Sequence, residues 1–186
     1  RSAGKVSPTD LASGVYFKKY VAPDGKTWQK LPDFKTMTPV SEGYTRFLDE
    51  SVAYGTTSSY GLVFKGYLYV PETGTYIFDL RSSDGSRLSI DGRTVVDNDG
   101  VHSAISKRNG IALETGYHPF QLEFFEQSLH GGKRRLAHRL WLGWEGPGLA
   151  MTQIADDDLF IPLNPAIPSL DLDVDVDQNN LATITP

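Results

Sequence analysis

The stretch YGLVFKGYLYVPETGTYIF, residues 60–78, decides the fold class. From Tyr60 to Val70 every second side chain is apolar or small, and this period of two residues is typical of a β-strand. The sequence PETG follows, which combines residues that favour turns, and the alternation resumes after it. The stretch therefore predicts two consecutive antiparallel strands joined by a short turn.

The same alternation continues on both sides of this stretch. Asp91-Gly92 fits a two-residue hairpin turn, because glycine accepts the positive φ that such turns require. Further short strands are expected around residues 15–17, 88–90, 95–96, 111–113, 120–125 and 138–144. Many short strands at this spacing predict an all-β protein, an antiparallel β-sandwich over residues 14–162 with few or no helices.

Three segments lack this alternation. Residues 1–13 are expected to be a polar lead-in, and residues 163–186 an acidic connector or the start of a further domain. Residues 22–59 contain three prolines and little periodicity, which predicts an irregular connection with at most one short strand or helical turn. Four of its aromatic side chains are expected to pin it to the core; they are Trp28, Phe34, Tyr44 and Phe47.

Composition excludes several classes of function. The net charge is −5, and four aspartates of the C-terminal segment supply most of it, so the body is nearly neutral and lacks the basic face that nucleic-acid binding needs. No apolar run approaches the roughly 20 residues of a membrane span, so no membrane insertion is expected. The absence of cysteine excludes disulfides and thiolate metal sites.

No sequence signature of catalysis is present. The chain lacks G-x-S-x-G, H-E-x-x-H and a phosphate-binding loop, and no motif selects the facing carboxylates of a glycosidase. The four histidines, His102, His118, His130 and His138, do not have metal-ligand spacing. We therefore expect a protein that is not an enzyme.

Five ordered segments resemble the anthrax protective-antigen-type domain family, whose β-sandwich modules occur in glycosidases, toxins, bacterial adhesins and yeast flocculins. The segments are YGLVFKGYLYVPETGTYIF (60–78), SSDGSRLSIDG (82–92), VVDNDGVH (95–102), LETGYHPFQLEFFE (113–126) and LWLGWEGPG (140–148). LPDF at 31–34 and TPV at 38–40 resemble the bacterial branch. The resemblance covers about residues 14–162 and implies the fold more strongly than the function.

The resemblance also implies a candidate metal site. In sugar-binding members, two adjacent aspartates bind a calcium ion, which in turn holds two sugar hydroxyls. The matching pair here is Ser83-Asp84, so a hydroxyl replaces one carboxylate and weakens any calcium site. The candidate metal ligands are Ser83, Asp84 and Gln127, and whether the loop still binds calcium stays open.

The second half of the family's site is a variable loop, which matches residues 126–135 by position alone. The candidate ligand-binding residues are Asp84, Gln127, Ser128, Leu129, His130, Gly131 and Gly132. The alternative for this loop is a hairpin connection without a ligand.

Two other features have structural interpretations. Asp97-Asn98-Asp99-Gly100 superficially resembles the start of a calcium-binding EF-hand loop, but Arg108 stands at the twelfth position, where a glutamate is required. We expect Asp97 and Asp99 to bond to nearby backbone amides. Trp144 alternates with leucines and is expected in the core, whereas Trp141 lies on the opposite face of the same strand.

These observations predict a lectin-like module of a larger secreted or surface protein, monomeric as an isolated domain, whose partner is a glycan. Two alternatives remain open. One is a structural or protein-interaction spacer in a bacterial surface protein. The other is a module that targets an attached glycosidase to its substrate.

Overall fold

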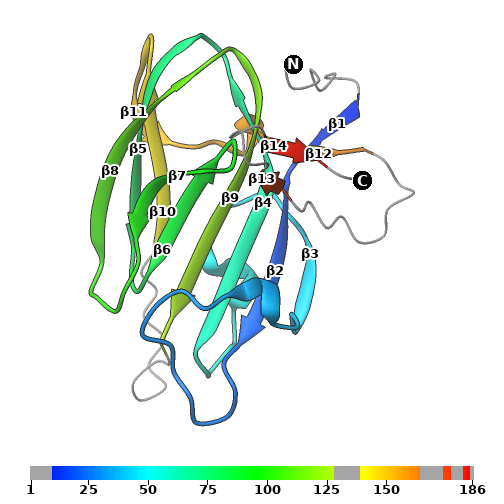
Figure 1. The fold of residues 1–186 in the computed structure, drawn as a ribbon, viewed down its shortest axis with the longest axis vertical. Helices are drawn as coiled ribbons and strands as arrows, with labels where there is room; N and C mark the ends of the chain where they lie inside the picture. Colours follow the sequence, from blue (N-terminus) through cyan, green and yellow to red (C-terminus); the bar gives the residue numbers. More distant parts are fainter. Residues whose placement is uncertain (1–9, 128–138, 164–173, 177–181, 185–186) are drawn as a thin grey trace.

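The computed structural model describes residues 10–127, 139–163, 174–176 and 182–184, and it shows two antiparallel sheets packed face to face (Figure 1). The eight-stranded sheet contains β1 (Leu11–Ser13), β2 (Val15–Val21), β3 (Ser41–Thr45), β4 (Tyr60–Val70), β6 (Ser86–Ile90), β7 (Arg93–Asn98), β9 (Gly116–Glu126) and β12 (Leu159–Pro162). The four-stranded sheet contains β5 (Gly74–Ser82), β8 (Ile105–Leu113), β10 (Leu140–Gly146) and β11 (Leu149–Gln153). The predicted fold class, an all-β antiparallel sandwich, is confirmed.

Helical structure in the described residues is sparse and includes three short 3-10 turns. They are η2 (Phe34–Thr36), η3 (Glu50–Ala53) and η5 (Asp156–Asp158). No helix in this part of the chain is long and apolar enough to cross a membrane. In the C-terminal segment, β13 (Val174–Val176) pairs with β14 (Ala182–Ile184) in a separate two-stranded sheet.

The central pair of the larger sheet is β4 with β9. The two strands pair over their whole length, from Tyr60 opposite Glu126 to Val70 opposite Gly116. Along β4 the residues of one alternation face the second sheet and are buried, as the period of two predicts. The ends of β4 and β9 therefore lie together, and this places Glu126 and the residue after it at one end of the sandwich.

The core between the sheets is rich in aromatic side chains. Trp144 is buried at the centre of this layer and stacks on Tyr76, with 5.3 Å between the ring centroids. Leu140 and Leu142 of the same strand join the core, so the prediction that this alternation faces inward is confirmed. Trp141 lies on the outer face of β10 and is half-buried.

The connection between β2 and β4 is pinned to the outer face of the larger sheet by two of the four aromatic side chains that were expected to do so. Phe34 is buried against Tyr20. Trp28 contacts the Phe34 ring edge-on, with 6.2 Å between the ring centroids. The prediction was wrong for Tyr44 and Phe47, each of which is 56% exposed. Tyr44 lies on β3, which pairs only with β2 and is therefore an edge strand that leaves such side chains in solvent.

Strand boundaries follow sheet edges as well as the hydrophobic pattern. The hairpin at Asp91-Gly92 is confirmed, with φ of 51° and 71° at the two residues. β8 begins at Ile105, six residues before the apolar run that predicted it, because it is an edge strand whose exposed residues can be polar. Residues 11–13, predicted within the lead-in, form β1 and pair with β12.

His118 in β9 is fixed by two hydrogen-bond partners. Its Nδ1 lies 2.8 Å from Asp91 Oδ2, and its Nε2 lies 2.8 Å from the Glu114 carbonyl oxygen. Burial by itself would lower the pKa of His118, but the hydrogen bonds and charges of Asp91 and Glu114 raise this pKa overall. The histidine is thus half-buried within a strand.

The raised pKa of His118 predicts a pH-dependent contribution to stability. A proton bound more tightly in the folded state stabilises fully below the unfolded pKa of about 6.5, and this stabilisation is lost as pH rises through the folded pKa. We expect His118→Gln to reduce the fall in the free energy of unfolding above about pH 6.5, measured by urea denaturation at several pH values. An unchanged pH profile in the variant would contradict this assignment.

Candidate functional site

Asp84 joins three chain segments at the end of the sandwich where β5 and β9 end and β6 and β10 begin (lower part of Figure 1). Its Oδ1 accepts a hydrogen bond from the backbone N–H of His102 at 3.1 Å. Its Oδ2 accepts one from the backbone N–H of Gln127 at 2.9 Å. One carboxylate therefore fixes the β7–β8 connection and the residue after β9 to the turn between β5 and β6.

Ser83 makes the complementary contact to the start of β10. Its backbone N–H donates to the Arg139 carbonyl oxygen at 2.9 Å, and its Oγ donates to the His102 carbonyl oxygen at 3.3 Å. The peptide bond between Ser83 and Asp84 is cis. Both described neighbours of segment 128–138 are thus bonded to this dipeptide.

The structure therefore brings together three of the residues that sequence analysis assigned to the site. Ser83, Asp84 and Gln127 are adjacent through the bonds just described. The other predicted ligand-binding residues, Ser128, Leu129, His130, Gly131 and Gly132, lie outside the described residues.

Gly85 allows the turn to pack closely against its neighbours. A Cβ atom at this position would lie 2.5 Å from Phe125 Cε1 and 2.8 Å from the Gly100 backbone nitrogen. The Gly85 carbonyl oxygen also accepts a hydrogen bond from the Phe125 N–H at 2.9 Å. Any larger residue would push the Asp84 turn away from β9 and from the β7–β8 connection.

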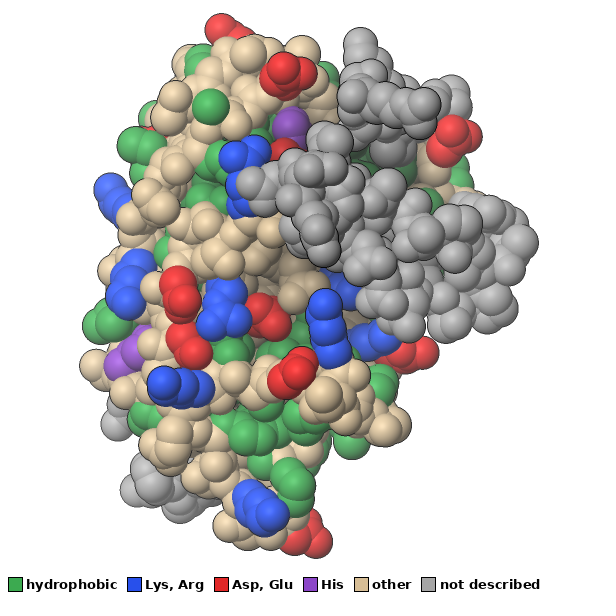
Figure 2. Space-filling view, in the orientation of Figure 1, with side chains coloured by type: hydrophobic (Ala, Val, Ile, Leu, Met, Phe, Trp, Pro, Cys, Tyr) green, Lys and Arg blue, Asp and Glu red, His purple; other side chains and the backbone are tan. Residues whose placement is uncertain are grey.

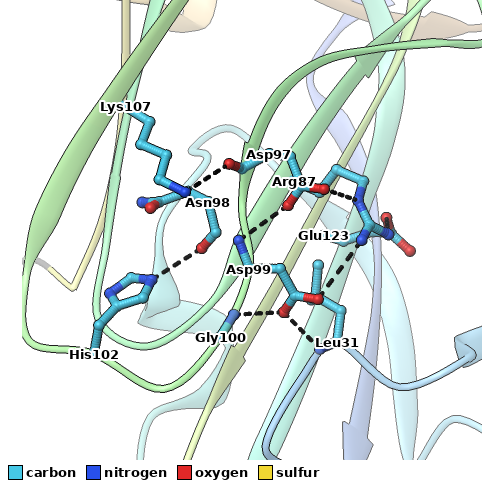
Figure 3. A network of polar contacts seen from close by, with 9 residues as sticks. All are labelled: Leu31, Arg87, Asp97, Asn98, Asp99, Gly100, His102, Lys107 and Glu123. Carbon is cyan, nitrogen blue, oxygen red and sulfur yellow. Dashed lines mark hydrogen bonds and ion pairs between the residues drawn. The ribbon is translucent and has the colours of Figure 1, made fainter.

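Asp97 and Asp99, at the end of β7, accept hydrogen bonds from backbone amides, as predicted (Figure 3). Asp97 Oδ1 accepts from the Asp99 N–H at 3.1 Å. Asp99 Oδ1 accepts from the N–H groups of Gly100 and Leu31, each at 2.7 Å. The contact with Leu31 ties the irregular 22–59 connection to the same end of the sandwich.

Arg87 is shared among three carboxylates in this corner (Figure 3). Its guanidinium nitrogens lie 3.6 Å from Asp97 Oδ2, 3.6 Å from Asp99 Oδ2 and 3.5 Å from Glu123 Oε2. Burial raises the pKa of Glu123, and the charge of Arg87 opposes this shift. The side chains in this corner bond to one another and to the backbone, which supports the structural interpretation of the Asp-Asn-Asp-Gly sequence.

The face shown in Figure 2 carries no basic patch over its described part. Lys and Arg side chains are interspersed with Asp and Glu side chains on this face. Mixed charge of this kind does not provide the concentrated positive potential that phosphate backbones require.

The β7–β8 connection, which Asp84 contacts, is itself well anchored. Asn98 is fully buried, and its Nδ2 donates to Ser82 Oγ at 3.2 Å and to the Ile105 carbonyl oxygen at 3.1 Å. The His102 ring nitrogens lie 3.0 Å from the Asn98 carbonyl oxygen and 2.9 Å from that of Ser103. Asp84 therefore accepts from an amide whose position is already fixed.

A buried ion pair lies beneath this junction, and sequence analysis did not predict it. Glu126 is 2% exposed; its Oε1 pairs with the Arg139 guanidinium, and its Oε2 accepts from the Tyr60 hydroxyl at 2.8 Å. Glu50 Oε1 accepts from the Arg139 backbone N–H at 3.0 Å, and Glu50 Oε2 is buried without a partner in the described residues. Burial, followed by the charge of Glu50, raises the pKa of Tyr60 well above its usual value.

Oxygen donors suitable for calcium are present but few. Asp84 and Ser83 contribute a carboxylate and a hydroxyl, and each oxygen keeps a lone pair beyond its protein hydrogen bond. The Gln127 side chain is anchored by its Nε2, which donates to the Trp28 carbonyl oxygen at 2.8 Å. Among described residues no three His, Cys, Asp or Glu side chains form a metal-binding group. The donor set thus supplies part of the six to eight oxygens that calcium takes.

The two-sheet sandwich and the polar junction at Asp84 define a β-sandwich module whose candidate site is built from loops at one end. A family model for the PA14 domain matches residues 36–158, more than half of the chain. The chain belongs to the PA14 domain family, the anthrax protective-antigen type.

Solved structures share this fold at low sequence identity. The PA14 sugar-binding domain from an RTX adhesin has a TM-score of 0.65 and 18% identity, covering 80% of this chain and 98% of its own. The PA14 domain of the MpAFP antifreeze protein has a TM-score of 0.62 and 17% identity, and the match covers 86% of this chain and 96% of that domain. The Epithelial Adhesin 9 A domain from Candida glabrata, in complex with Galb1-4GlcNAc, has a TM-score of 0.63 and 13% identity. The match covers 87% of this chain and 95% of that domain. A comparison with curated protein sequences finds no match.

Proposed function

We propose that this domain is a lectin-like, non-catalytic module of a larger secreted or surface protein and that it binds a glycan at the Asp84 junction. The observation that carries the proposal is the position of Asp84, which is bonded to Gln127 on one side of segment 128–138. Ser83 is bonded to Arg139 on its other side. Structural neighbours that include a sugar-binding domain and an adhesin solved with Galb1-4GlcNAc support the same function.

The chemistry of the junction suits hydroxyl recognition. Asp84 and Ser83 present oxygen atoms that accept from sugar hydroxyls directly or ligate a cation, with Gln127 as the third candidate ligand. A bound calcium ion would supply an electrostatic link to two neighbouring sugar hydroxyls. Because one carboxylate is a hydroxyl here, we expect weaker calcium binding than a site with two aspartates would have.

A structural or protein-interaction module is the second candidate function. It is favoured by the bonding of Asp84, both of whose oxygens already accept from backbone N–H groups. In that case the carboxylate serves to hold three loops together and no sugar is bound. A module that targets an attached glycosidase would use the proposed sugar site and differ only in the protein that contains it.

A glycan array tests the proposal, run once in millimolar calcium and once in chelator. Binding that disappears in chelator would support calcium-dependent recognition despite Ser83. Binding that survives chelator at this junction would keep the lectin function and remove the ion from it. No binding under either condition would contradict the proposed function and favour the second candidate.

A further inference from the structure

A second polar and aromatic surface lies on the outer face of the four-stranded sheet, beside the strand ends that form the Asp84 junction. Trp141 and Gly143 lie on this face of β10, because Leu140, Leu142 and Trp144 face the core. On β5 the residues directly opposite them are Arg81 and Asp79.

The six-membered ring of Trp141 packs over Gly143 on this face of the sheet. A Cβ atom on Gly143 would lie 2.1, 2.7 and 2.9 Å from three carbon atoms of the six-membered ring, Cη2, Cζ3 and Cζ2. The ring therefore covers the backbone of Gly143, and only a residue without a side chain permits this position. The residue is half-buried, so part of the indole is exposed to solvent on this face.

Beside the indole lies a carboxylate that is only partly satisfied. Asp79 is 4% exposed although it is on the outer face. Its Oδ2 accepts from Arg108 Nε at 2.7 Å, whereas its Oδ1 is buried without a hydrogen-bond partner in the described residues. A buried acceptor left without a donor is costly, which points to a donor supplied from outside the protein. The Arg108 side chain is 58% exposed, so its ion pair with Asp79 borders solvent.

Arg81 provides a second guanidinium at the same place. It is exposed and stands directly opposite Trp141, and its side chain makes no hydrogen bond or ion pair in the part of the chain that the structure describes. The flat ring is therefore bordered by one acceptor and two cationic donors. A pyranose sugar fits this combination, because its C–H face packs on an aromatic ring while its hydroxyls donate and accept hydrogen bonds.

We infer that this surface, formed by Trp141, Gly143, Asp79, Arg81 and Arg108, is a second glycan-binding site that does not depend on calcium. The sugar ring stacks on Trp141, one hydroxyl donates to Asp79, and the two arginines donate to other sugar oxygens. This inference goes beyond the proposed function, since none of these residues belongs to the Asp84 junction.

The experiment is a glycan array of neutral and uronic-acid oligosaccharides probed in chelator with the whole chain and its variants. We expect Trp141→Ala to weaken binding by about tenfold or more. Gly143→Ala should act similarly, because its methyl group displaces the indole without removing it. Arg93→Ala, an exposed arginine on the other sheet, is the matched control and should leave binding unchanged.

The remaining outcomes separate the ligand source and the two sites. A loss in Arg81→Ala confined to uronic-acid glycans would identify an acidic sugar, and an equal loss on neutral glycans would identify a neutral one. The inference is overturned if no glycan binds in chelator, or if Trp141→Ala binds as well as the unmodified chain. If binding is still seen in calcium in that case, the proposed function at the Asp84 junction stands. As a check independent of variant folding, the fluorine NMR signal of 5-fluoro-Trp141 should shift with a bound oligosaccharide, and that of buried Trp144 should not.

Discussion

Replacing Arg139 by alanine is expected to lower the free energy of unfolding by about 3–5 kcal/mol, the usual loss when one partner of a buried ion pair is removed. Glu126 is 2% exposed and pairs with the Arg139 guanidinium, so the variant leaves its negative charge buried. The Glu50 carboxylate, which bonds to the Arg139 backbone, adds a second negative charge nearby. Urea unfolding at neutral pH measures the loss.

Two comparisons identify the cause of this loss. Arg93→Ala removes an exposed arginine of β7 and should change the free energy of unfolding by no more than about 0.5 kcal/mol. Adding Glu126→Gln to Arg139→Ala removes the buried, unpaired negative charge and should restore part of the lost stability. If the double variant were less stable than Arg139→Ala by the full effect of the second change, the two side chains would not be coupled.

Replacing Asp84 by alanine is expected to have the second large effect, on both stability and calcium response. The change removes two hydrogen bonds to a charged group, which predicts a loss of about 2–4 kcal/mol. It also removes the only carboxylate among the three candidate calcium ligands. Any calcium-dependent rise in the melting temperature should therefore disappear, as measured by thermal unfolding with millimolar calcium and with chelator.

Asp84→Asn separates the two roles of this residue. The amide keeps one acceptor oxygen and lacks the charge, so we expect intermediate stability without a calcium response. The matched control is Asp157→Ala, a change at an exposed aspartate, which should retain the stability and any calcium response of the unmodified chain. A calcium response that persists in Asp84→Ala would place the ion elsewhere, with the aspartates of residues 171–177 as the next candidates.

The strands and their inward faces could be predicted from the sequence, because the period of two is a local property of each strand. The alternation from Tyr60 to Val70 and the position of Trp144 were confirmed in this way. The hairpin at Asp91-Gly92 was equally local, since its backbone angles depend on two residues. The family resemblance then located the Ser83-Asp84 turn.

Edge strands marked the limit of this approach. Aromatic character alone suggested that Tyr44 would be buried, but the edge position of β3 leaves it in solvent. The first half of β8 was not predicted, because its residues are mostly polar and lie exposed at the edge of the sheet. Which strand becomes an edge is decided by the pairing of the whole sheet and has no signal in the strand itself.

The sequence by itself determined that this protein is an all-β module with a polar turn at Asp84. Only the tertiary structure decided what that turn contacts: Asp84 accepts from amides 18 and 43 residues away. It also decided that Arg139 pairs with Glu126 and that the Trp141 ring packs over Gly143, which stands opposite Asp79. These contacts depend on the register in which distant strands pair, and that register is set by packing of the complete sandwich, whereas alternation is written into each strand.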